Sequence, residues 1–227
     1  WALGLKEAGR VADAIRLLEE TRAVAERVLR PDHLDHLVTL YHLATAYHAA
    51  DRLEDAEVLQ TDAHRQLRAR LGTRHPQTLA SMASLVRIRA AARRLDEAAA
   101  LMTECLTLQA GRRSPLQREL LHALSDLAAA YQRADRWAEA VTWYERLRTA
   151  LVQARGATHM DTLVAMTRLA NAYQKVGRHD DAVPLSEEVL RVLKARLGPE
   201  HVDTLQAVHN LGLAYRGLGR LEESATL

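Results

Sequence analysis

Apolar positions along this chain recur every 42 residues, and each period holds two stretches with helical spacing. In one copy of the first stretch, Leu163, Met166, Leu169, Ala170 and Tyr173 lie three, one or four positions apart, which predicts one buried helix face. The spacing recurs in two leucine rows: Leu37, Leu79, Leu121, Leu163 and Leu205, then Leu43, Leu85, Leu127, Leu169 and Leu211. Tyrosine follows at Tyr47, Tyr131, Tyr173 and Tyr215, with Arg89 in the remaining copy. A fixed period of this length predicts a helical repeat array.

The second stretch of each period begins at an arginine. These arginines are Arg10, Arg52, Arg94, Arg136, Arg178 and Arg220, and three residues after each comes an acid: Asp13, Asp55, Glu97, Glu139, Asp181 and Glu223. The positive end of a helix dipole favours an acid in the first turn. The spacing of three also allows an ion pair with the arginine. We therefore predict a second helix that starts near each arginine.

Short breaks separate the predicted helices. Before the arginines, at positions where we expect left-handed backbone, stand Gly9, Asp51, Asp135, Gly177 and Gly219. The second helices are expected to end before Gly72, Gly156 and Gly198. One loop position holds His33, His75, His159 and His201, and we interpret these as histidines hydrogen-bonded at helix starts. Pro76 suits the first position of a helix, because its missing N–H costs little there.

The pattern resembles the tetratricopeptide repeat, in the long 42-residue form found in kinesin light chains and in many bacterial signalling proteins. The residues that carry the resemblance are Leu197-Gly198-Pro199-Glu200-His201-Val202-Asp203-Thr204-Leu205, Asn210-Leu211-Gly212-Leu213-Ala214-Tyr215 and Gly219-Arg220-Leu221-Glu222-Glu223-Ser224. The resemblance covers the whole chain and implies an all-α, right-handed superhelical solenoid of stacked antiparallel helix pairs. It is specific for the fold and unspecific for the ligand.

A single domain of about five and a half repeats is expected. The repeats are 1–36, 37–78, 79–120, 121–162, 163–204 and 205–227, and both ends cut a repeat, so we expect a fragment of a longer protein. The third unit, 79–120, departs from the pattern: Arg89 replaces the tyrosine, Arg93 replaces the turn glycine, and residues 111–117 replace the histidine loop. The packing and loop shape of this unit therefore stay open.

Composition narrows the function classes. The 227 residues are 48% hydrophobic and 26% charged, which is typical of a folded chain, and the absence of phenylalanine leaves the core to alanine and leucine. The net charge of +2, with acids and bases interleaved, argues against nucleic acid as a partner. Cys105, the single cysteine, is interpreted as a buried structural thiol. No run of 18 apolar residues and no signal peptide occur, so we expect a cytoplasmic protein without a membrane partner.

No motif predicts catalysis, a metal site or a cofactor. Histidines of successive loops are too far apart to share a zinc ion, and the acids of the second helices are explained by the helix dipole. Neither a phosphate-binding glycine loop nor a nucleophile elbow is present. We expect a protein that is not an enzyme.

The resemblance places a partner along the concave face, on outward positions of the first helices. These are Tyr41, Thr45 and His48; Ala83, Arg87 and Ala90; Ser125, Ala129, Gln132 and Arg133; Thr167, Asn171, Gln174 and Lys175; His209, Leu213 and Arg216. Because they alternate with core positions, we expect none of them to be buried. Cations beside amides suit an extended or acidic peptide, since amides hold peptide backbone and cations hold carboxylates. The alternative is that these polar residues solvate an exposed helix face.

Other functions stay open beside a protein- or peptide-binding scaffold. The array could be the sensor or regulatory arm of a bacterial signalling enzyme, such as a kinase or signalling ATPase. It could also be a structural array that self-associates through uncapped ends. The arginines of the third unit, among them Arg87, Arg89 and Arg94, either contact an anionic partner or have drifted in a repeat held by its neighbours.

Overall fold

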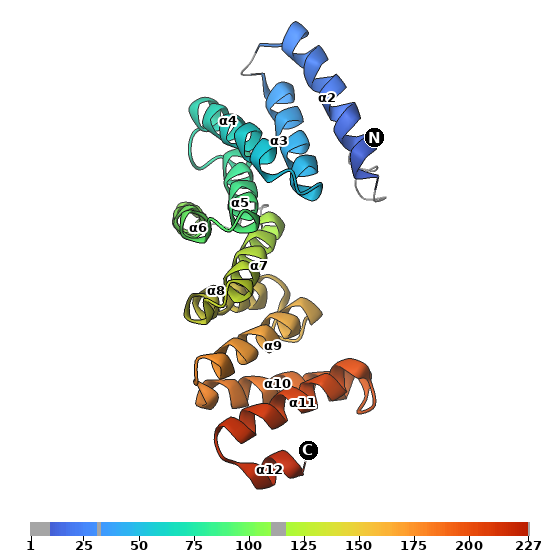
Figure 1. Cartoon of the computed structure of the whole chain (residues 1–227), viewed down its shortest axis with the longest axis vertical. Helices are drawn as coiled ribbons and strands as arrows, with labels where there is room; N and C mark the ends of the chain where they lie inside the picture. The colour runs from blue at the N-terminus through green and yellow to red at the C-terminus, as the bar shows by residue number, and fades with distance from the viewer. Residues whose placement is uncertain (1–9, 31–32, 110–116, 227) are drawn as a thin grey trace. The chain divides into compact units, whose positions relative to one another are not determined.

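The computed structural model describes residues 10–30, 33–109 and 117–226, and all regular structure within these ranges is helical (Figure 1). The helices are α2 (Val11–Val28), α3 (Leu34–Ala49), α4 (Leu53–Leu71), α5 (Pro76–Ala91), α6 (Leu95–Gln109), α7 (Gln117–Arg133), α8 (Trp137–Arg155), α9 (Met160–Lys175), α10 (His179–Leu197), α11 (Val202–Gly217) and α12 (Leu221–Ala225). The predictions of an all-α fold and of two helices per period are confirmed. Gly9 and the loop at 111–116 lie outside the described residues.

The chain divides into two compact units, residues 1–127 and 128–227, and the division falls within α7. In the first unit, each of α2 to α5 packs against the helix that follows it, and α3 also touches α5. In the second unit, α8 to α12 pack in the same sequential way, and α9 also touches α11. First helices of neighbouring repeats therefore contact each other as well as their own second helix.

The predicted leucine rows form the core. Leu37, Leu43, Leu127, Leu163 and Leu169 are at most 1% exposed. In the first unit, Leu37 and Leu43 of α3 share one apolar cluster with residues of α4 and with Ile88 of α5. Leu205 differs, because it is 54% exposed.

The turns between first and second helices follow one design. The residue before each repeat arginine has a positive φ at Asp51, Arg93, Asp135, Gly177 and Gly219. The arginine N–H then donates to the carbonyl five residues earlier, as at Arg178 to Tyr173, 2.8 Å, and at Arg94 to Arg89, 2.9 Å. Arg93 thus takes the same left-handed conformation as the glycines. The third unit keeps the turn despite its sequence.

The starts of the helices match the sequence predictions. Each second helix begins after its repeat arginine, and this arginine pairs with the acid three residues later, for example Arg178 Nε with Asp181 Oδ2 at 2.7 Å. The first helices α3, α5, α9 and α11 are capped by histidines, whose Nδ1 accepts the N–H two residues on at 3.2 Å. Pro76 is the first residue of α5, and Gly72, Gly156 and Gly198 end the second helices with positive φ.

One contact in the second unit sets a close approach between helices. His179 is the first residue of α10, and Gly217 is the last residue of α11. A Cβ atom on Gly217 would collide with the His179 imidazole ring. The buried Nδ1 of this ring has no hydrogen-bond partner among the described residues. α10 itself continues through Pro184.

Candidate functional site

The site residues predicted in the first unit lie on α3 and α5. Tyr41, Thr45 and His48 are half-buried on α3, and the Thr45 hydroxyl donates to the Tyr41 carbonyl at 2.7 Å. Burial, and then the nearby Glu119 carboxylate, raise the pKa of Tyr41. Arg87 of α5 is already engaged, because its Nε donates to Asp126 of α7 at 2.6 Å. A ligand carboxylate would have to compete with Asp126 for this guanidinium.

The expectation that the whole predicted row is exposed is wrong for α5. Ala83 is 2% exposed and Ala90 is 4% exposed. The reason is packing, since α5 contacts α3, α4 and α6 and is tied to α7 through Arg87. With neighbours around most of its circumference, α5 leaves little surface for a partner.

The second unit presents the predicted row more openly. Thr167, Asn171 and Lys175 lie four residues apart along α9; the first two are half-buried and Lys175 is exposed. Lys175 Nζ lies 5.7 Å from the centre of the Trp137 ring, within the range of a cation–π contact. His209 and Arg216 are exposed on α11, and Arg133 is exposed at the end of α7. Gln132 accepts a 2.6 Å hydrogen bond from the buried Tyr144 hydroxyl, so its carbonyl group is used within the unit.

A groove of about 220 Å³ runs between α9 and α11. We call it the α9–α11 groove; its lining residues are Met160, Leu163, Val164, Thr167, Arg168, Leu193, Asp203, Gln206, Ala207 and Asn210. Its walls are mainly apolar. Two charged side chains, Arg168 and Asp203, also line it. Of the predicted site residues, the groove contains Thr167.

Sequence reasoning missed Arg168, Gln206 and Asn210. A signal for two of them exists, because Arg168 and Asn210 occupy one repeat position, whose other members are His42, Ser84 and Asp126. This position is polar in every copy, although it lies on a helix whose neighbouring positions carry the core. A repeat position that is polar in every copy and lies beside core positions indicates the edge of the buried face of the first helices.

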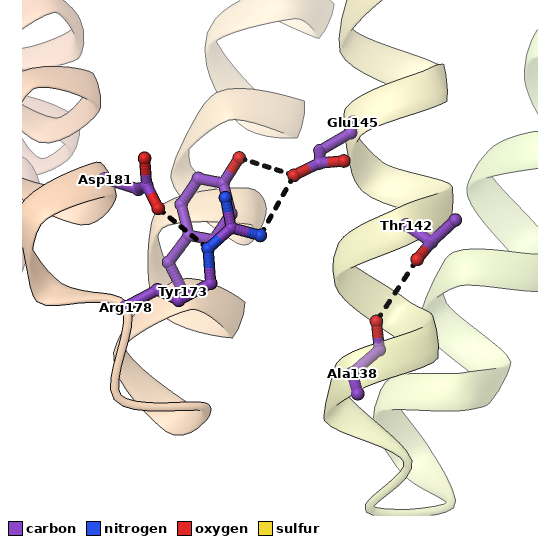
Figure 2. Close-up of polar contacts among 6 residues, drawn as sticks. All are labelled: Ala138, Thr142, Glu145, Tyr173, Arg178 and Asp181. Atoms are coloured by element: carbon purple, nitrogen blue, oxygen red, sulfur yellow. Dashed lines mark hydrogen bonds and ion pairs between the residues drawn. The ribbon is translucent and has the colours of Figure 1, made fainter.

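A polar network joins neighbouring repeats in the second unit (Figure 2). The Tyr173 hydroxyl of α9 donates to Glu145 Oε1 of α8 at 2.8 Å, and Arg178 Nη1 lies 3.3 Å from the same oxygen. The Arg178 guanidinium stacks 4.3 Å from the centre of the Tyr173 ring, while its Nε binds Asp181. In the same view, Thr142 donates to the Ala138 carbonyl at 3.4 Å within α8. We call Tyr173, Glu145 and Arg178 the tyrosine joint.

The tyrosine joint recurs elsewhere. Tyr47 donates to Glu19 at 2.6 Å, and Tyr215 donates to Glu187 at 2.6 Å. In both copies the repeat arginine stacks on the tyrosine ring, Arg52 at 4.0 Å and Arg220 at 4.5 Å from the ring centre. The joint thus recurs as a contact between neighbouring repeats. These arginines, tyrosines and acids therefore have a structural role.

The third unit replaces this joint with charges. Arg89 Nε donates to Glu57 of α4 at 3.1 Å, and Arg94 also pairs with Glu57. Both guanidinium groups lie 3.9 Å from Glu97 Oε2. We call Arg89, Arg94, Glu57 and Glu97 the arginine joint. Arg87 pairs with Asp126 in the same way. Three arginines of the basic third repeat therefore have carboxylate partners within the first compact unit.

Three further reactive side chains of the first unit, His64, Ser81 and Cys105, lie at buried or half-buried positions. Ser81 Oγ lies 2.7 Å from His64 Nδ1, but Ser81 is fully buried and its hydroxyl donates to the Thr78 carbonyl, so no substrate reaches it. Burial lowers the pKa of His64 and raises that of Cys105 to about 11, which keeps this buried thiol protonated. Within the described ranges, no three His, Cys, Asp or Glu side chains are placed to hold a metal ion. None of the described helices combines the length and apolarity needed to cross a membrane.

The regular helix pairs, capped turns and joints are matched by a family model for the tetratricopeptide repeat, over residues 1–69, 119–195 and 161–227. The chain belongs to the tetratricopeptide repeat family. The matches leave out residues 70–118 of this repeat array, the stretch that contains Arg89 and Arg93. Proteins built from this repeat generally mediate protein–protein interactions. A comparison with the sequences of curated proteins finds no match.

Solved structures share the fold. A Podosopora anserina chain of nearly identical, kinesin-light-chain TPR-like repeats has a TM-score of 0.72 and 28% identity, over 86% of this array and 92% of that chain. A STAND signal transduction ATPase with a tetratricopeptide repeat sensor, from Pyrococcus horikoshii, has a TM-score of 0.68 and 16% identity, over 99% of this array and 33% of that chain. A Rap protein complexed with Competence and Sporulation Factor has a TM-score of 0.61 and 10% identity, over 99% of this array and 70% of that chain. The last two show the fold alone.

Proposed function

We propose that this array is a non-enzymatic scaffold that binds an extended segment of a partner protein or peptide in the α9–α11 groove. The observation that carries the proposal is the groove itself, about 220 Å³ in volume, with apolar walls and the polar groups of Thr167, Gln206 and Asn210. Sites of this composition bury apolar side chains and orient the ligand with a few polar contacts.

The row along α9 extends this site. Asn171 and Lys175 continue the line that begins at Thr167, and neither is buried in the core. The Asn171 amide suits the backbone of an extended peptide, and Lys175 suits a carboxylate at its end. His209 and Arg216 on α11 offer further polar contacts for the same peptide. The first unit contributes less to the proposal, since Arg87 is paired and α5 is largely covered.

A charge placed in the groove wall tests the proposal. Val164 lines the groove and is 48% exposed, so Val164→Glu is expected to leave the fold intact. Val152→Glu on α8 is the matched control, because Val152 is 36% exposed and does not line the groove. The full chain is first screened against an immobilised peptide library. The peptides that bind are then labelled and titrated with the full chain, and binding is measured by fluorescence anisotropy. We expect Val164→Glu to weaken binding about tenfold or more, and Val152→Glu to leave it unchanged.

Substitution of the polar residues along α9 provides a second test. A double substitution of Asn171 and Lys175 to Ala is expected to weaken the same peptides while the melting temperature stays near that of the parent chain. If no library member binds, or if both glutamate variants bind as well as the parent, the groove is not a peptide site.

A second candidate is the sensor arm of a larger signalling enzyme. The STAND protein of similar fold carries a tetratricopeptide repeat sensor, and this array spans a third of that chain. The two proposals agree on peptide or protein recognition and differ in what recognition controls. A structural array that self-associates is the third candidate. Light scattering at several concentrations separates it, because association of copies must grow with concentration.

A further inference from the structure

The floor of the α9–α11 groove is polar. A small cavity of about 10 Å³ shares Thr167, Ala207 and Asn210 with the groove and is lined further by Ala170, Ser186 and Val189. Ser186 lies on α10 and is 4% exposed, and its hydroxyl has no hydrogen-bond partner among the described residues. A buried hydroxyl without a partner is unfavourable, because it has lost its hydrogen bonds to water and gained none in return. The floor therefore holds hydrogen-bonding capacity that the chain itself does not use.

The groups at this floor have defined donor and acceptor roles. The Thr167 hydroxyl donates its proton to the Leu163 carbonyl at 2.9 Å, so its oxygen is left as an acceptor. Asn210 Oδ1 accepts from Gln206 Nε2 at 3.2 Å, which turns the Asn210 NH₂ group into the remaining donor. Ser186 Oγ can act in either role. A ligand group that both donates and accepts satisfies all three.

The space above the floor limits what can carry that group. The groove walls at Leu163, Val164 and Leu193 are apolar and suit a stem of methylene groups. The small cavity admits no more than the last atoms of a side chain, since its volume is about that needed by one water molecule. Arg168 and Asp203 both line the groove, so the groove favours neither sign of charge. Burying a charged end without a partner would also be costly.

We propose that the α9–α11 groove selects a glutamine side chain of an extended peptide, with the carboxamide placed against Ser186, Thr167 and Asn210. This inference rests on the proposed function and names its specificity. The carboxamide oxygen accepts from the Asn210 NH₂ group, and the carboxamide NH₂ donates to Thr167 or Ser186. Methionine fills the same volume but leaves Ser186 unpaired, and glutamate buries a charge.

A matched set of peptides tests the selection. Library members that bind the full chain, and whose binding is lost in Val164→Glu, are resynthesised with Gln, Met or Glu at each position in turn. At one position we expect Gln to bind about tenfold more tightly than Met or Glu. Ser186→Ala is expected to reduce this preference about fivefold or more. Thr149→Ala, an exposed threonine on α8 outside the groove, is the control and keeps the preference.

The melting temperature of the free chain gives an independent reading. Because the Ser186 hydroxyl is unpaired, Ser186→Ala is expected to keep or raise the melting temperature while it weakens the glutamine peptides. A lower melting temperature would mean that the hydroxyl already has a partner in the free chain, which overturns the inference. Peptides that depend on Val164 but prefer Met or show no preference also overturn it and leave the proposed function standing. If no peptide depends on Val164, both fail.

Discussion

The tyrosine joint of the second unit and the arginine joint of the first solve the same packing problem with different chemistry. Tyr173 fills the contact with a ring, 8% exposed, and adds one hydrogen bond to Glu145. Arg89 stands at the same repeat position, and its side chain is 22% exposed and paired with Glu57, which is 19% exposed. The first joint adds apolar area and a neutral donor to its Arg178–Glu145 ion pair, whereas the second consists of opposite charges alone.

The difference shows how much freedom the repeat allows. The turn after the first helix is unchanged at Arg93, and Leu85 remains 3% exposed in the core. In α5 and the turn that follows it, the change affects one contact between repeats, which matches the nearest-neighbour stability of such arrays. The basic character of the third unit follows in part from this exchange, since Arg89 and Arg94 serve the joint.

The largest expected effect comes from the buried leucine rows, which have members in each unit. Leu169→Ala and Leu85→Ala remove side chains that are 0% and 3% exposed, and each should cost about 2–5 kcal/mol of unfolding free energy. Urea denaturation of the two variants checks this. Similar losses of unfolding free energy would mean that the two regions differ at their joints and not in their leucine cores. A loss below about 1 kcal/mol for Leu85→Ala would show that the third unit is loosely packed.

The next effect separates the two joints. Glu57→Gln leaves two guanidinium groups beside a neutral amide and should cost about 1–3 kcal/mol. Glu145→Gln should cost less than about 1 kcal/mol, because the amide oxygen still accepts from Tyr173 and the side chain is 44% exposed. Unfolding is measured at about 0.05 M and 1 M salt. The penalty of Glu57→Gln should shrink in high salt, and equal salt responses would remove the distinction between the joints.

Alkaline pH should act on the tyrosine joint. Burial, and then the hydrogen bond to Glu145, raise the pKa of Tyr173 to about 12 from an ordinary value of 10.0. Between these values the folded chain holds a proton that the unfolded chain has lost, so this contribution to stability is complete below pH 10 and disappears as pH rises through 12. Tyr173→Phe should therefore lose less stability than the parent between pH 9 and 12. Parallel pH curves for the two chains would contradict this account.

The smallest effect is expected outside both joints. Asn171 is half-buried on α9, and Asn171→Ala should change the unfolding free energy by less than about 0.5 kcal/mol. Thermal unfolding of this variant beside Leu169→Ala measures the contrast directly. A melting shift as large as that of Leu169→Ala would reverse the assignment of these two positions to surface and core.

The repeat period was sufficient to predict the fold and most of its local detail. It placed the leucine rows, the left-handed turns before Arg52 and Arg178, the arginine–acid pairs and the capping histidines, because each depends on residues close in sequence. It also carried the tyrosine joint without naming it, since Glu19, Glu145 and Glu187 share one register.

The candidate site could be predicted less well. The burial of Ala83 and Ala90 depends on how many helices surround α5, and the engagement of Arg87 depends on Asp126 of another helix. A periodic sequence gives each first helix the same face, so it does not reveal which copy is covered. The floor of the α9–α11 groove is formed by Ser186 of a second helix, whereas the sequence prediction considered first helices alone.

The contact of His179 with Gly217 bears on the engineering of this array. The equivalents of Gly217 are Lys175, Arg133, Ala91 and Ala49, and those of His179 include Trp137 and Leu95. A consensus segment grafted over α11 would introduce a Cβ atom into the imidazole ring, whereas a graft that also replaced His179 would not. His179 and Gly217 must therefore be exchanged together. A recombination point between α9 and α10 keeps the two residues in one segment, whereas a point between α10 and α11 separates them.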